Sequence, residues 1–106
     1  MSERIEATTP LWRWSGGESG GDWYFVSIDG EAGDALSAHA LMERLELGRR
    51  RGFGSVKVRV TVGGSTWTTS AFPMKERGWS IPIKAAVRRA EGLNESEALT
   101  ITIEPI

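Results

Sequence analysis

The chain has 106 residues, of which 40% are hydrophobic and 25% charged, and this length indicates one domain with a single core. Its formal net charge is −1, and the absence of cysteine excludes a disulfide framework, a thiolate nucleophile and a cysteine-based zinc site. No apolar run approaches the ~20 residues that cross a bilayer, and the first residues lack the pattern of a secretory signal, so we expect a cytoplasmic protein.

The first part of the chain predicts an N-terminal tail over residues 1–10 and then two strands. Residues 11–14 alternate apolar and polar side chains, residues 15–21 form a turn rich in Gly and Ser, and residues 23–28 form a compact apolar strand. Because both faces of this second strand are apolar, we expect it to be covered on both sides or to lie against a helix.

Residues 34–47 predict the first helix. Asp34 suits the N-cap, and Gly48 suits the position just after the last turn. Four apolar side chains at helical spacing predict a buried stripe, namely Leu36, Ala40, Leu41 and Leu45.

Residues 56–62 give the clearest strand of the chain, because valine alternates with polar residues at every second position. Gly63-Gly64 supplies the backbone geometry of a tight hairpin. Residues 66–72, rich in Thr and aromatic side chains, predict the next strand.

The last part of the chain predicts a short strand, a second helix and a final strand. Gly78 opens the short strand over residues 79–83, which Pro82 makes an edge strand or brings to an end, because proline has no N–H to donate. The second helix covers about residues 84–91 and ends at Gly92, and residues 99–104 alternate again. We expect three side chains of this helix to face inward, namely Ala86, Val87 and Ala90.

Each half of the chain therefore has the order strand, strand, helix, strand. Residues 11–62 form one copy and residues 66–104 the other, with Trp23 and Trp79 at matching places. This predicts a mainly β fold: a closed six-stranded pseudo-barrel with a helix over each end, which leaves no exposed sheet edge.

Five stretches resemble a bacterial family known as domain of unknown function nineteen-oh-five. They are Leu-Trp-Arg-Trp (11–14), Trp-Tyr-Phe-Val-Ser-Ile (23–28), Gly-Phe-Gly-Ser-Val-Lys-Val (52–58), Gly-Gly-Ser-Thr-Trp-Thr-Thr-Ser-Ala-Phe-Pro (63–73) and Ile-Pro-Ile-Lys-Ala-Ala-Val-Arg-Arg-Ala-Glu-Gly-Leu (81–93). The resemblance implies a double-split β-barrel of the kind found in AbrB/MazE-type transcription factors. It implies no activity and no catalytic residue.

Few residues of the chain suit catalysis. His39 is the only histidine and has no companion at metal-ligand spacing, so we expect it to be a structural or surface residue. Ser70 and Ser80 have no evident base beside them. The Gly-rich residues 16–21 lack the lysine and the following helix of a phosphate loop. The sequence therefore predicts a protein that is not an enzyme and has no metal or cofactor.

Positive charge and tryptophan supply the candidate binding residues. Residues 1–48 contain three basic and nine acidic side chains, whereas residues 49–89 contain ten basic side chains and one acidic one. Either these charges are spread over a solvated surface, or they gather into a face that binds phosphates or carboxylates. The candidate residues of that face are Arg49, Arg50, Arg51, Lys57, Arg59, Lys84 and Arg88.

The tryptophans, five in number, are expected in the core of so small a domain. An aromatic side chain left exposed beside Lys84 and Arg88 would instead mark a ligand pocket, for which Trp67 and Trp79 are the candidates.

Three hypotheses for function remain open. The first is a non-catalytic binding or regulatory module whose basic face holds an anionic partner, with specific DNA binding as a weaker form of it. The second is a small-ligand binder with a tryptophan-lined cleft near residue 84. The third is a domain that docks on a larger protein. The sequence sets neither the oligomeric state nor the identity of the ligand.

Overall fold

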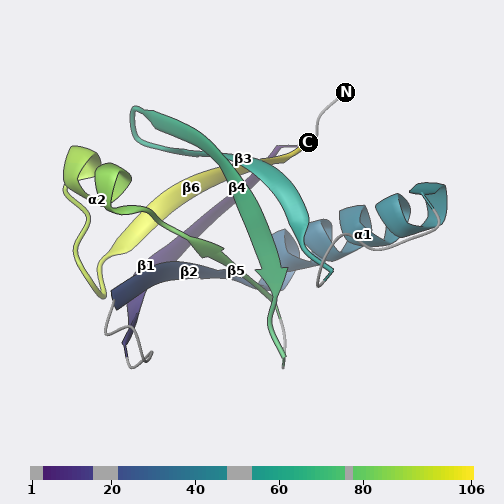
Figure 1. Ribbon diagram of the computed structural model, residues 1–106, viewed down its shortest axis with the longest axis horizontal. Coiled ribbons are helices and arrows are strands. Elements are labelled where there is room, and N and C mark those ends of the chain that lie inside the picture. Colours follow the sequence, from purple (N-terminus) through teal and green to yellow (C-terminus); the bar gives the residue numbers. More distant parts are fainter. Residues whose placement is uncertain (1–3, 16–21, 48–53, 76–77) are drawn as a thin grey trace.

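The computed structural model describes residues 4–15, 22–47, 54–75 and 78–106, and in these the chain is a closed antiparallel barrel of six strands with two helices. The helices lie on opposite sides of the barrel, and α1 extends away from it (Figure 1). In chain order the elements are β1 (Ile5–Ser15), β2 (Asp22–Ile28), α1 (Gly30–Leu47), β3 (Val56–Val62), β4 (Ser65–Pro73), β5 (Trp79–Pro82), α2 (Ala85–Glu91) and β6 (Ala98–Pro105).

The barrel core follows the alternation that the sequence predicts. In β3 the valines at 56, 58, 60 and 62 are buried while Lys57 and Arg59 are exposed, and Leu99, Ile101 and Ile103 of β6 are buried in the same way. Val60 lies opposite Ile103 and Trp67 across the ladders, so one layer of side chains fills the interior between three strands.

The strand order around the barrel is β1-β2-β5-β4-β3-β6, and exchanging the two halves of the chain leaves it unchanged. The halves interleave: β2 pairs with β5, and β3 pairs with β6. The predicted mainly β fold with a closed six-stranded barrel is thus confirmed, and neither half forms a barrel alone.

The two helices begin in the same way. The carbonyl oxygen of Asp29 accepts a bond from the amide of Gly33, and that of Lys84 accepts one from Arg88, each at 3.1 Å. Asp29 therefore corresponds to Lys84, and Gly33 to Arg88.

The register between β2 and β5 identifies the counterpart of Trp79. Ile28 pairs with Trp79 just before α1, and the amide of Ile83 donates to the carbonyl of Tyr24 at 2.8 Å just before α2. Tyr24, and not Trp23, corresponds to Trp79, so the predicted match of the two tryptophans is wrong by one residue.

The structure also corrects the expected element boundaries. Residues 5–10 are not a tail: they form the first part of β1 and pair with β6 from Ile5 to Pro10. Helix α1 starts at Gly30, so Asp34 is a helical residue and not the N-cap. Gly30 and Gly33 are poor helix formers, which concealed this start in the sequence.

The expected buried stripe of α1 holds only near the barrel. Leu36 is fully buried and Ala40 packs partly against the core, but Leu41 is half exposed and Leu45 is 70% exposed. The reason is geometric: the far part of α1 extends beyond the barrel, where the described residues offer nothing to cover it (Figure 1).

Helix α2 is short and buries little of its surface against the barrel. Val87 is buried, whereas Ala86 and Ala90, also expected to face inward, are exposed. Gly92 ends the helix in the left-handed conformation, as predicted. Glu91 holds this end in place, because its carboxylate accepts a bond from the Ser65 hydroxyl at 2.6 Å. Neither α1 nor α2, as described, is long and apolar enough to cross a membrane.

Candidate anion-binding site

A gap in the barrel wall opens where β5 ends. Pro82 has no N–H for a ladder bond, and β5 stops at this residue as predicted, although pairing with both β2 and β4 makes it an interior strand. Strand β4 pairs with β5 only at Phe72 and Pro73. Residues 67–69 of β4 are therefore separated from the start of β2, and the beginning of α2 borders the space between them.

This gap forms a cavity of ≈ 500 Å³, which we call the α2 cavity. Its volume falls within the range of small-molecule sites. Its lining residues come from β2, β4 and the β5–α2 segment, and they are Asp22, Trp23, Tyr24, Trp67, Thr68, Thr69, Pro82, Ile83, Lys84, Ala85 and Arg88. Three aromatic rings and two cations thus border one space.

Arg88 is held in a fixed orientation in the α2 cavity. Its guanidinium lies over the ring of Tyr24, 3.7 Å from the centroid, and its Nε donates to the carbonyl of Ile83 at 3.3 Å. These contacts leave the terminal N–H groups, the ones that form paired bonds to a carboxylate or phosphate, without a protein acceptor among the described residues. The side chain is therefore arranged before any ligand arrives.

Lys84 adds a second positive charge to the cavity. It is exposed and precedes the first residue of α2, and within the described part of the chain neither Lys84 nor Arg88 has a carboxylate within 4.0 Å. Their positive field is therefore not cancelled by a described ion pair.

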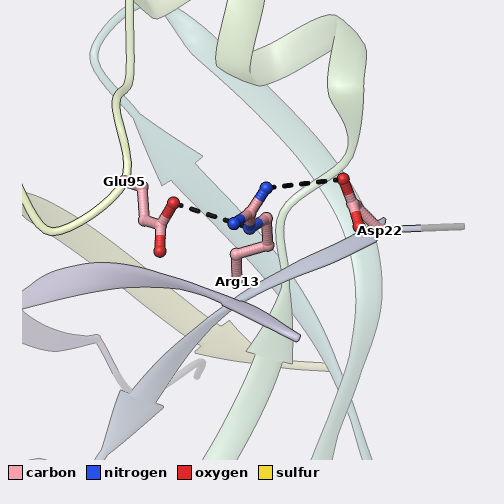
Figure 2. Close-up of polar contacts among 3 residues, drawn as sticks. All are labelled: Arg13, Asp22 and Glu95. Atoms are coloured by element: carbon pink, nitrogen blue, oxygen red, sulfur yellow. Dashed lines mark ion pairs between the residues drawn. The ribbon is translucent and has the colours of Figure 1, made fainter. Parts of the chain in front are cut away.

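Asp22 is the one acidic residue among the described residues that line the α2 cavity. Arg13 compensates it: its Nη1 lies 3.7 Å from the Asp22 carboxylate, while its Nε lies 3.6 Å from Glu95 (Figure 2). Figure 2 shows the guanidinium between the two carboxylates. All three side chains are more than a third exposed, so the network adds little stability. Arg13 therefore offsets part of the negative charge at Asp22, since this one guanidinium serves two carboxylates.

The structure separates the two tryptophans predicted for a pocket. Trp67 lines the α2 cavity and is 9% exposed. Trp79 does not line it: this side chain is 5% exposed and its Nε1 donates to the Ser37 hydroxyl of α1 at 3.1 Å. Trp79 therefore packs against α1, and the structure does not bring it together with Lys84 and Arg88.

The candidate basic residues lie in three places. Lys84 and Arg88 meet at the α2 cavity. Lys57 and Arg59 do not line it and lie on the outer side of β3, where Arg59 is opposite Thr68 on one side and Glu104 on the other. Arg49, Arg50 and Arg51 fall outside the described residues.

Two cavity residues, Trp23 and Tyr24, were absent from the sequence prediction. Only the β2–β5 register brings the start of β2 beside α2, and no local pattern signals that approach. Trp23 is 55% exposed and its cross-strand partner Trp14 is 48% exposed, so the expectation of five core tryptophans is wrong for this pair. Among the described residues, little covers Trp23 on the outer face of β2, whereas Phe25 on the same face is half-buried.

The described residues contain no cluster of three side chains able to hold a metal ion. His39 lies in α1, where its Nε2 is 3.4 Å from the carboxylate of Glu43, one turn further along. Ser70 and Ser80 are on β4 and β5, and among the described residues neither is hydrogen-bonded to a side chain that could act as a base.

A comparison with protein families found a match that covers most of the chain, including the cavity and nearly all of the barrel. Residues 8–103 match the model of a domain of unknown function, DUF1905, and the chain belongs to this family. A comparison with curated proteins found no match.

Proposed function

We propose that this protein is a non-catalytic binding module whose α2 cavity holds a small organic anion. The observation that carries the proposal is a preset guanidinium beside a second cation, neither with an ion-pair partner among the described residues, in a cavity of ≈ 500 Å³. A carboxylate or phosphate would accept from Arg88 in paired fashion and gain from the charge of Lys84. Fixing Arg88 on Tyr24 in advance lowers the ordering entropy lost on binding.

A thermal-shift measurement tests this proposal, because a ligand that binds only the folded chain must raise the midpoint. The probes are benzoate, cyclohexanecarboxylate, phenyl phosphate and inorganic phosphate, each compared with sodium chloride at equal ionic strength. We expect at least one organic anion to raise the midpoint. If none does so beyond the chloride control, the proposed function is wrong.

Matched variants place the effect in the cavity. Arg88→Ala should weaken binding at least about tenfold, since it removes a charge-assisted hydrogen bond. Arg89→Ala, on the same helix but outside the cavity lining, should leave binding unchanged. The same comparison applies to Lys84→Ala and Lys57→Ala. Equal loss in both members of a pair would indicate a general charge effect instead.

A second candidate is an interaction domain that docks on another protein. It is favoured by the outer face of the β1–β2 pair, where Trp14 and Trp23 are about half exposed and Trp12 stacks on Phe25 with ring centroids 4.8 Å apart. Replacing Trp14 with Ser should then prevent capture of the partner without affecting anion binding.

Nucleic-acid binding is the weaker form of the anionic-partner proposal. We propose that the barrel is a double-split barrel of the AbrB/MazE kind, supported by its unchanged strand order when the halves are exchanged. Such a likeness of fold does not transfer DNA binding. A labelled duplex tested at low salt, where counterion release favours binding most, decides the question: no binding there eliminates it.

A further inference from the structure

We infer that the ligand of the α2 cavity is a planar aromatic acid, whose ring packs against Trp23 and Trp67 while its carboxylate or phosphate binds Arg88 and Lys84. This inference rests on the proposed function and specifies the class of anion. It has its own test. An aliphatic acid of the same charge and similar size should bind if the cavity holds any organic anion, but should bind more weakly than an aromatic acid if the inference is right.

The apolar part of the cavity is aromatic on two sides. Trp23 stands on β2 and Trp67 on β4, the two strands that border the gap. Trp23 is 55% exposed although it lines a cavity, so much of its indole is free to contact a ligand. Aromatic rings prefer offset-stacked or edge-to-face contacts with other rings, which favours a planar ligand over a puckered one.

The charged part of the cavity also favours a flat ligand. Arg88 lies on Tyr24 with one face of its guanidinium, so its edge and its other face remain for a ligand. A guanidinium accepts aromatic stacking on its face and binds a carboxylate along its edge. The acidic group of the ligand can therefore bind along the free edge of Arg88 while its ring contacts the tryptophans.

Thr68 and Thr69 belong to the same lining, and a threonine hydroxyl can donate to ring substituents or to phosphate oxygens. The cavity volume of ≈ 500 Å³ leaves room for a ligand larger than benzoate, the simplest probe. Carboxylate and phosphate forms share this chemistry, and the experiment separates them.

The test compares dissociation constants, measured by calorimetry, for benzoate and cyclohexanecarboxylate, which carry the same charge and differ mainly in planarity. We expect benzoate to bind about fivefold more tightly, from the usual strength of one aromatic contact. Phenyl phosphate against benzoate then shows which acidic group the site prefers. If cyclohexanecarboxylate binds as tightly as benzoate, the inference is wrong and the proposed function stands.

A matched pair of tryptophan variants locates the stacking contact. Trp23→Leu should remove the preference for benzoate, whereas Trp14→Leu should keep it, because Trp14 is the cross-strand partner of Trp23, is similarly exposed and does not line the cavity. Both variants change exposed positions, so both should fold. A preference that survives Trp23→Leu would overturn the stacking role given to this residue.

Discussion

The segments that lead into α1 and α2 occupy related positions on the barrel, yet one is filled by packing and the other is open. Before α2, Tyr24, Lys84 and Arg88 border a cavity of ≈ 500 Å³. Before α1, the counterparts of these residues are Trp79, Asp29 and Gly33, and the remaining space is ≈ 180 Å³.

The difference comes from the side chains at the helix starts. Gly33 lets α1 approach so closely that a Cβ there would lie 2.8 Å from the carbonyl oxygen of Ile28. Arg88, at the same place on α2, has a side chain that donates to the carbonyl of Ile83, the counterpart of Ile28, and lies over the ring of Tyr24. The barrel therefore tolerates divergence at this position, with close packing in one copy and a bordering cavity in the other.

The largest test of this comparison is the pair Trp79→Ala and Tyr24→Ala. Trp79 is buried and hydrogen-bonded to Ser37, so its loss should lower the free energy of unfolding by about 4 kcal/mol. Tyr24 is partly exposed, so Tyr24→Ala should lower the free energy of unfolding by about 2 kcal/mol. Urea unfolding measures both values.

The two variants should also differ in binding. Tyr24→Ala releases Arg88 and should weaken benzoate binding, whereas folded Trp79→Ala should retain wild-type affinity. A weaker affinity in Trp79→Ala would contradict the division between a packed end and a binding end.

The barrel could be predicted from the sequence because the pattern that indicates each strand lies within the strand itself. Alternation in residues 56–62 sets which side chains face inward, and Pro82 sets the end of β5. Alternation says nothing about how the two ends of the barrel differ. The sequence prediction named Lys84, Arg88 and Trp67 from the basic helix and its neighbourhood, and it also named Trp79, which lies at the α1 end.

The missing part of the prediction depends on pairing between distant segments. Trp23 and Tyr24 reach α2 only through the β2–β5 register. The first turn of α1 contains Gly33, which allows close docking on Ile28 in spite of its poor helix propensity. Likewise Ile5–Pro10 becomes strand by pairing with β6, although Pro10 and the Thr-rich stretch show no clear alternation.

A glycine pair tests the close packing at the α1 end. Gly78 has φ +75°, and a Cβ there would lie 2.7 Å from the Ile28 carbonyl oxygen, so Gly78→Ala should destabilise the chain by about 3 kcal/mol through clash and backbone strain. Gly92 has φ +63° and open space around it, so Gly92→Ala should cost only about 1 kcal/mol, the backbone contribution alone. Equal losses in the two variants would show that the approach to Ile28 is not tight.

The smallest expected effect concerns the charge of Asp22, which lines the α2 cavity. Arg13→Met keeps a long side chain but leaves Asp22 without its cation, and unfolding free energy should change by less than about 1 kcal/mol because the ion pairs are exposed. Benzoate binding should weaken about threefold at low salt, since an uncompensated carboxylate then lines the cavity beside Lys84 and Arg88, and the deficit should shrink as salt screens it. Arg13→Met combined with Asp22→Asn should recover wild-type affinity. If the double variant stays weak, Arg13 acts by packing and not by neutralising Asp22.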